Sequence, residues 1–132
     1  MIKVVLDTNI LISGIFWKGL PQRIVDLASA NEIESITTQE ILEEVKTALE
    51  RLDVPLEKIE EIIKDIMSYS RLIAAKKVVV KDLRDFKDVK IIACALSAEV
   101  DYIVTGDKDL LVVKEYEGIQ IVNPKTFLEL IR

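Results

Sequence analysis

The fold is decided by the stretch Ile2-Lys3-Val4-Val5-Leu6-Asp7-Thr8-Asn9, an apolar run that ends abruptly at a carboxylate. A short run of this kind, rich in β-branched residues, is typical of a strand buried on both faces of a parallel sheet. Functional sites in such sheets lie at the carboxyl ends of the strands. Asp7 is therefore a candidate site residue, although the same carboxylate could instead only cap a helix starting near Ile10.

The rest of the chain alternates between apolar runs and helical periodicity, with few glycines or prolines. Further strands are predicted over 32–36, 77–80, 102–105 and 119–122, and helices over 21–30, 38–52, 55–72, 88–99 (or from 85) and 124–131. Strands that alternate with helices form a parallel sheet covered on both faces. We therefore predict the α/β class, as a three-layer α/β/α sandwich with a central, mainly parallel sheet in one domain over 1–132.

The amino-acid composition excludes several classes of protein and of functional site. The 132 residues include one cysteine, Cys94, and no histidine, which excludes a disulfide framework, zinc sites built on cysteine or histidine, and histidine-based catalysis. No apolar run approaches the roughly 18–20 residues of a membrane span, and Asp7 comes too early for a signal peptide. We expect a cytoplasmic protein with no membrane partner.

The net charge of −5 hides a strong asymmetry along the chain. Residues 26–66 carry twelve acids and four cations, whereas residues 71–90 carry seven cations and three acids. The second segment is basic enough to face phosphates, although scattered solvated lysines would give the same count.

Glu44 is the one glutamate of its predicted helix that can lean toward the sheet. At about 100° per residue, Glu44 falls at the edge of the apolar arc, beside Ala48, whereas Glu40 and Glu43 fall well outside it. Glu44 is a candidate site residue for this reason, and an ordinary surface glutamate is the alternative.

Asp88 and the turn after residues 102–105 supply the remaining carboxylates. If its helix includes Asp88, this residue shares a face with the core, where an ionised carboxylate is costly unless it is paired or bound to metal. The alternative is that Asp88 is the N-cap. Gly106 permits a sharp turn that carries Asp107 and Asp109, which could equally be a simple helix-capping turn.

Together, these signals place carboxylates from four segments near the strand ends. Such groups repel one another unless a cation compensates them. Mg²⁺ or Mn²⁺ prefers oxygen ligands, and a site of this kind suits hydrolysis of phosphodiester bonds without histidine.

Four stretches of the sequence resemble PIN-domain proteins, most closely the toxin components of toxin–antitoxin systems. They are Leu6-Asp7-Thr8-Asn9, Glu40-Ile41-Leu42-Glu43-Glu44-Val45, Asp88-Val89-Lys90-Ile91-Ile92-Ala93 and Val104-Thr105-Gly106-Asp107-Lys108-Asp109. The resemblance covers nearly the whole chain and implies an Mg²⁺- or Mn²⁺-dependent ribonuclease acting on single-stranded RNA.

The resemblance also implies roles for individual residues. It implies catalytic, metal-binding carboxylates at Asp7, Glu44, Asp88 and Asp107 with Asp109 adjoining them, and supporting roles for Asn9 and Thr105. One departure is that many relatives carry adjacent acids at the third position, where this chain has Lys87-Asp88-Val89.

Two other functions compete with this interpretation. An aspartyl phosphatase of the haloacid dehalogenase type needs a second acid two residues after the first, where this chain has Asn9. A phospho-receiver signalling module has an acidic Mg²⁺-binding pocket, but it needs a mid-chain strand ending in an aspartate, where 38–72 is predicted as two helices. All four carboxylates are present, so nothing in the sequence supports a catalytically inactive RNA-binding domain.

Partner surfaces are expected as well. The helices predicted over 21–30 and 55–72 are rich in apolar residues, and Phe16 and Trp17 lie in a segment expected to be partly exposed. Exposed apolar patches mark interfaces, and closed dimers are the commonest assembly. We expect a homodimer, and the resemblance adds an antitoxin protein as a further partner.

Overall fold

The computed structural model describes residues 1–77 and 86–132. Within these residues the strands are β1 (Lys3–Leu6), β2 (Glu34–Thr38), β3 (Ser70–Ile73), β4 (Tyr102–Val104), β5 (Glu115–Tyr116) and β6 (Ile119–Val122). The helices are α1 (Thr8–Phe16), α2 (Leu20–Ser29), α3 (Gln39–Arg51), α4 (Leu56–Tyr69), α5 (Phe86–Ala98), α6 (Lys108–Leu111) and α7 (Pro124–Leu130).

The strands form one sheet in the order β3-β2-β1-β4-β6-β5. Neighbouring strands are parallel except for the short antiparallel pair of β5 and β6. In the central strand, Val5 pairs with Ile36 on one side and with Ile103 on the other. Val5 is fully buried, as expected for a strand covered on both faces. The prediction of a mainly parallel α/β sandwich is confirmed.

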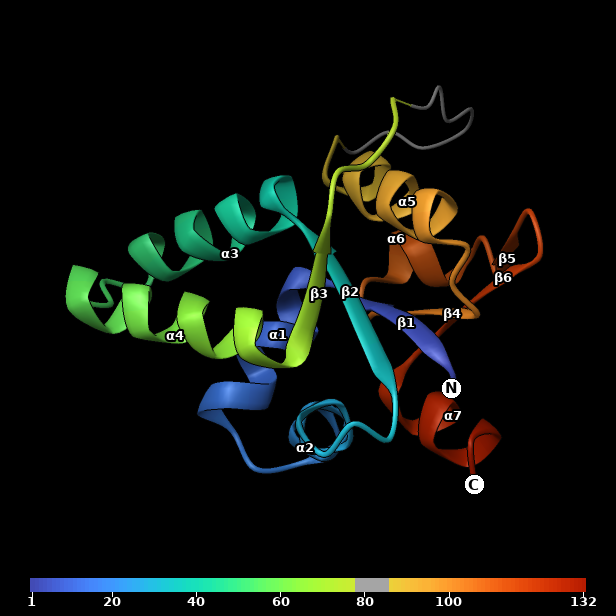
Figure 1. Ribbon diagram of the computed structural model, residues 1–132, viewed down its shortest axis with the longest axis horizontal. Helices are drawn as coiled ribbons and strands as arrows, with labels where there is room; N and C mark the ends of the chain where they lie inside the picture. The colour runs from blue at the N-terminus through green and yellow to red at the C-terminus, as the bar shows by residue number, and fades with distance from the viewer. Residues whose placement is uncertain (78–85) are drawn as a thin grey trace.

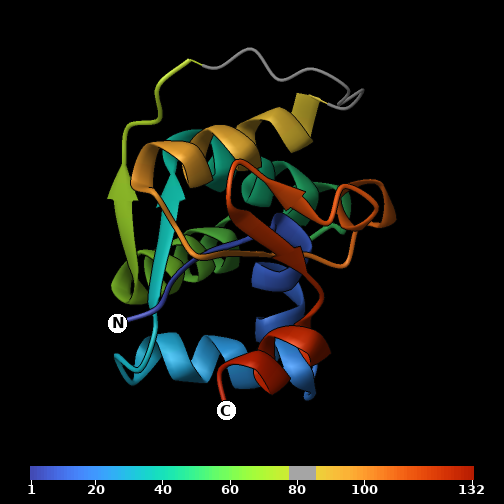
Figure 2. The ribbon, with the colours of Figure 1, turned by 90° about the vertical axis from the view of Figure 1, so that its right-hand side faces the viewer.

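Helices cover the two faces of the sheet (Figure 1). α1, α3 and α4 lie on one side of strands β1 to β3, and α5 lies on the other. α2 and α7 pack side by side at the opposite end from α3 and α5, in both views (Figure 2). α3 and α5 come into contact beyond the carboxyl ends of the strands. This crossing of two helices from opposite layers creates the walls of a site at that edge.

Local signals explain where the helices begin. The Thr38 hydroxyl accepts a hydrogen bond from the Ile41 N–H at 3.2 Å and so caps the N-terminus of α3. Asn123 caps α7 in the same way, and Pro124 occupies its first turn. None of the helices within the described ranges has the length and apolar composition needed to cross a bilayer.

The structure differs from the sequence-based prediction at the end of α4 and in two short elements, and it does not test one predicted strand. The predicted helix over 55–72 ends at Tyr69, because Ser70–Ile73 pair in parallel with β2 as strand β3. Tertiary pairing, with the Ser35 and Ser70 hydroxyls 3.0 Å apart, overrides the helical periodicity of this segment. The strand predicted over 77–80 lies outside the described residues except for Lys77, which is not in a strand. α6 and β5 are short elements that the prediction did not include.

Candidate active site

A cavity of about 340 Å³ opens at the carboxyl edge of the sheet, between α1, α3 and α5. Its walls carry four of the predicted carboxylates together with hydroxyls, an amide and two cations. The lining residues are Asp7, Thr8, Asn9, Glu44, Thr47, Ala48, Arg51, Asp88, Lys90 and Asp107. Segments far apart in the sequence therefore meet in one polar pocket, at the edge where a parallel sheet places its sites.

Asp7 sits at the junction of β1 and α1 and has two roles in the structure. It is the N-cap of α1, and its Oδ1 accepts a hydrogen bond of 2.7 Å from the Thr8 N–H. Its Oδ2 accepts a hydrogen bond of 2.6 Å from the Thr105 hydroxyl at the end of β4. Asp7 therefore does cap a helix, although that helix starts at Thr8 and not near Ile10. Capping is not its only role, because Asp7 also lines the cavity.

Burial raises the pKa of Asp7 above its ordinary value of 3.8. The hydrogen bonds from Thr105 and Thr8 oppose that shift, whereas the neighbouring Asp107 and Glu44 carboxylates add to it. The raised pKa of Asp7 is therefore mainly a consequence of its burial, and the two neighbouring carboxylates add a smaller effect of the same sign.

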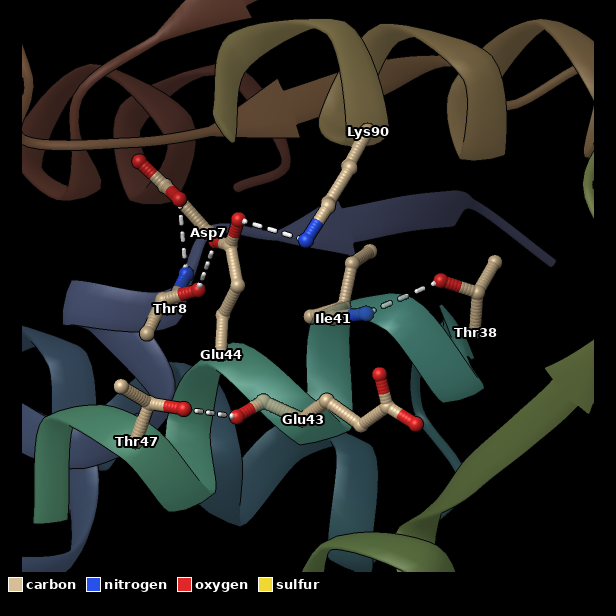
Figure 3. Close-up of polar contacts among 8 residues, drawn as sticks. All are labelled: Asp7, Thr8, Thr38, Ile41, Glu43, Glu44, Thr47 and Lys90. Atoms are coloured by element: carbon tan, nitrogen blue, oxygen red, sulfur yellow. Dashed lines mark hydrogen bonds and ion pairs between the residues drawn. The ribbon is translucent and has the colours of Figure 1, made fainter. Parts of the chain in front are cut away.

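Glu44 projects from α3 toward the sheet, as its place at the edge of the apolar arc predicted (Figure 3). Its Oε1 lies 3.2 Å from the Lys90 Nζ of α5, and its Oε2 accepts a long hydrogen bond of 3.5 Å from the Thr8 hydroxyl. Its side chain is only 12% exposed. The alternative of an ordinary surface glutamate is therefore wrong for this residue.

Asp88 lies in the first turn of α5, which begins at Phe86, so the alternative in which Asp88 is the N-cap is wrong. Its side chain is 3% exposed, on the same helix as the buried Ile91 and Ile92. A carboxylate in the first turn is favoured by the positive end of the helix dipole. The structure places this buried acid in the cavity wall opposite α3.

Asp107 and Asp109 follow β4 in the turn that starts α6. Asp107 is the N-cap, and its Oδ1 accepts a hydrogen bond of 2.9 Å from the Asp109 N–H. The Thr105 hydroxyl, which donates to Asp7, also accepts from the Asp107 N–H at 3.0 Å. Asp107 lines the cavity, whereas the exposed Asp109 side chain does not.

The structure thus brings together Asp7, Glu44, Asp88 and Asp107, with Asn9 at the exposed rim and Thr105 fully buried behind Asp7. The sequence-based selection did not include Thr8, Thr47, Arg51 and Lys90. The spacing from Glu44 to Thr47 and Arg51 follows one helix face and could have identified two of them. Nothing in the sequence pattern indicated that Lys90 would reach Glu44.

The donor set suits a hard divalent cation, because the four carboxylates offer only oxygen and one of them has a raised pKa beside two others. Among the described residues, however, no three carboxylates are already arranged to hold one ion. The two carboxylate oxygens of Glu44 face Lys90 and Thr8.

Thr105 gives the first testable prediction. Thr105→Val keeps the shape of this fully buried side chain but removes the hydroxyl that joins Asp7 to Asp107. We expect a loss of about 1–3 kcal/mol in the free energy of unfolding, because buried polar groups lose their partner. The pKa of Asp7 should also rise further, since the Thr105 hydrogen bond lowers it.

Urea unfolding measures the first effect, and NMR titration of the Asp7 carboxyl carbon measures the second. Thr47→Val is the matched control, because the Thr47 hydroxyl is exposed and donates a hydrogen bond of 3.0 Å to the Glu43 carbonyl of its own helix. The control should change stability by less than about 0.5 kcal/mol. Equal losses in the two variants would contradict a bridging role for Thr105.

Comparison with known proteins agrees with this architecture. The model of the PIN domain family matches residues 3–109, so this chain belongs to the PIN-domain family. Six chains of solved structures are similar to it. One is from the crystal structure of VapBC2 from Rickettsia felis bound to a DNA fragment from their promoter, with a TM-score of 0.64 and 13% sequence identity. The match covers 92% of this chain and 98% of that one.

No curated protein matches the sequence. The structure and the sequence also separate the competing functions. The mid-chain region forms the helices α3 and α4, where a phospho-receiver needs a strand, and position 9 is an asparagine, where the phosphatase needs an acid. The chain is therefore a PIN-domain protein with a cavity lined by four carboxylates.

Proposed function

We propose that this protein is an endoribonuclease that hydrolyses phosphodiester bonds of single-stranded RNA and depends on Mg²⁺ or Mn²⁺. The observation that carries the proposal is the convergence of Asp7, Glu44, Asp88 and Asp107 on one cavity. The raised pKa of Asp7, to which Asp107 and Glu44 contribute, supports a site that is completed by a cation.

Each carboxylate has a distinct task in this proposal. Asp7, held by hydrogen bonds from Thr8 and Thr105, would be a ligand in a fixed orientation. Glu44 would contribute from α3 and Asp88 from α5. Asp107 would be the fourth ligand, with Asp109 beside it in the same turn. A divalent cation bound there would activate water and neutralise the charge that develops on the phosphorus and the leaving oxygen. Because the chain has no histidine, protons would be carried by other groups of the cavity, such as the carboxylates, Lys90 or water.

The cations of the cavity fit a phosphodiester substrate. Arg51 lies at the end of α3, two turns beyond Glu44, and lines the same cavity. An RNA strand could therefore meet positive charge on both sides of the acidic set, at Arg51 and at Lys90. Asn9, at the exposed rim, can hydrogen-bond either to RNA or to the side chains that hold the ion.

A cleavage assay tests the proposal. End-labelled single-stranded RNA, double-stranded RNA and single-stranded DNA are each incubated with the protein in Mn²⁺, in Mg²⁺ and in EDTA. We expect internal cleavage of single-stranded RNA only, abolished by EDTA. A parallel incubation with acetyl phosphate, followed by mass spectrometry, checks for a phosphoaspartate. Phosphorylation without RNA cleavage would contradict the ribonuclease and favour the receiver-like alternative.

We further propose that the enzyme acts in the cytoplasm as the toxin of a toxin–antitoxin pair. The similar fold of VapBC2, whose structure was solved bound to a DNA fragment from the promoter, supports this proposal. A neighbouring gene for a small antitoxin should relieve the growth arrest caused by this chain. Arrest by wild type but not by Asp7→Asn, relieved on co-expression, is the expected pattern.

The protein is also proposed to be a homodimer. Phe16 and Trp17, packed edge to face with centroids 5.8 Å apart, are 40% and 60% exposed at the end of α1. Met67 of α4 is 48% exposed. Light scattering at micromolar concentration should give twice the 15.0 kDa mass of the chain. Trp17→Ser should shift the equilibrium toward monomer, and a wild-type mass of one chain would contradict the dimer.

A further inference from the structure

Lys90 and Glu44 form an ion pair in the wall of the cavity. The Nζ of Lys90 on α5 lies 3.2 Å from the Oε1 of Glu44 on α3, and the two side chains are 21% and 12% exposed (Figure 3). The Lys58–Glu61 pair on the surface of α4 is longer, at 3.7 Å, and its side chains are 51% and 67% exposed. Screening by water is therefore much weaker for Lys90 and Glu44, and their interaction is correspondingly stronger.

This pair determines where Glu44 points. Lys90 faces one carboxylate oxygen, and the Thr8 hydroxyl donates weakly to the other at 3.5 Å. Glu44 is thus directed at an ammonium group from the opposite helix layer. This direction is in line with the finding that, among the residues described, no three carboxylates are set up to share an ion.

We propose that Lys90 is a built-in counter-ion that a divalent cation has to displace from Glu44. Lys90 would thereby set the concentration of Mg²⁺ or Mn²⁺ at which the site fills. This inference rests on the metal site of the proposed function. An ammonium and a divalent cation compete for the same carboxylate, so the free energy of the Lys90–Glu44 pair is subtracted from that of ion binding.

Removing Lys90 should change the stability of the metal-free protein and its affinity for Mn²⁺ in opposite directions. A purely structural cross-link between the helices would not raise the affinity when it is lost. Lys90→Met retains the aliphatic stem but leaves the cavity with one more uncompensated negative charge. The metal-free protein should become less stable, because α3 and α5 lose their ion pair and the carboxylates repel more strongly. Mn²⁺ should nevertheless bind more tightly, on the order of tenfold for a partly buried pair at this distance.

Titration calorimetry of the metal-free protein with Mn²⁺ measures the affinity, and thermal melts with and without Mn²⁺ measure the stability. Lys90→Arg, which keeps the charge and the reach, should bind Mn²⁺ with an affinity within about threefold of wild type. Lys90→Gln is the second neutral variant, in case Lys90→Met does not fold. Lys58→Met removes the exposed ion pair of α4 and should leave the affinity for Mn²⁺ unchanged.

Arg51→Gln distinguishes pairing from overall charge. Arg51 lines the same cavity, but the structure gives it no ion pair with a described carboxylate. Its loss should tighten Mn²⁺ binding far less than the loss of Lys90. In a Glu44→Gln background, Lys90→Met should no longer increase the affinity, because the group it competes for is neutral.

The outcomes are separable. If wild type binds Mn²⁺ and both neutral Lys90 variants bind it equally or more weakly, the competition is overturned while the metal site stands. If Arg51→Gln tightens binding as much as Lys90→Met, general charge explains the effect and the inference is overturned. If wild type binds no Mn²⁺ at millimolar concentration, the metal site of the proposed function fails, and the inference fails with it.

Discussion

Asp7→Asn is expected to reduce RNA cleavage by at least two to three orders of magnitude while leaving the fold intact. Asp7 is held in the cavity by two short hydrogen bonds, from the Thr8 N–H and the Thr105 hydroxyl. Asparagine can occupy the same position and caps a helix about as well as aspartate. It offers one neutral oxygen in place of a carboxylate, however, and so binds a divalent cation poorly. Losses of this size are typical when transition-state charge stabilisation is removed.

The same substitution should not lower the stability of the metal-free protein at neutral pH. The pKa of Asp7 is raised in the fold, so the folded state binds a proton more tightly than the unfolded state. The stability contributed by protonated Asp7 is fully present below the ordinary value of 3.8 and is lost as pH rises through the raised value. Asp7→Asn removes this loss, because its side chain does not titrate.

The measurements are gel-based cleavage of a labelled single-stranded RNA in Mn²⁺ and urea unfolding at several pH values in EDTA. Asp26→Asn, on the exposed surface of α2, is the matched control and should retain full activity. Full activity in Asp7→Asn would show that cleavage comes from a contaminating nuclease or from another site. A large loss of stability would show that its charge is needed for folding.

The second large effect is stabilisation of the fold by the metal. Mn²⁺ should bind the converged carboxylates and have little affinity for the dispersed ones of the unfolded chain. At a hundredfold excess over the dissociation constant, the free energy of unfolding should rise by about 2.7 kcal/mol. Asp88→Asn should abolish both the shift and the cleavage, because Asp88 is a buried carboxylate in the cavity wall and a ligand in the proposed metal site.

Thermal melts with and without Mn²⁺ decide this prediction. Asp107→Asn and Asp109→Asn provide a sharper comparison, since only Asp107 lines the cavity. We expect Asp107→Asn to lose most of the shift and Asp109→Asn to lose little. An unchanged shift in Asp88→Asn would remove Asp88 from the metal site, and the reverse order of Asp107 and Asp109 would exchange their roles.

Much of the fold could be predicted from local patterns. The buried run that ends at Leu6, the cap at Thr38 and the proline at 124 each mark an element that the structure contains. The end of α4 could not be predicted, because Ser70–Ile73 continue an apolar periodicity that suits a helix. Only the neighbouring strand β2, more than thirty residues earlier in the chain, provides the hydrogen-bonding partners that make this segment a strand.

Some features of the candidate site could likewise be predicted from the sequence, whereas others could not. The positions of Asp7 and Asp107 follow from where apolar strands end, and the inward lean of Glu44 follows from helical geometry. The structure adds the contacts between segments. Thr105 joins Asp7 to Asp107, and Lys90 reaches Glu44 across two layers. Neither contact has a sequence signal, since residues that are distant along the chain have no fixed relation until the sheet and both helix layers are assembled.

The sequence by itself determined the class of fold, the absence of histidine chemistry and the four carboxylates that a hydrolytic site could use. These properties depend on residue type and on periodicities of two and 3.6 residues, which are local. Only the tertiary structure decided the environment of those carboxylates: the burial that raises the pKa of Asp7 and the ammonium group that holds Glu44. Desolvation and Coulombic interactions depend on distances through space, and packing of the layers sets those distances.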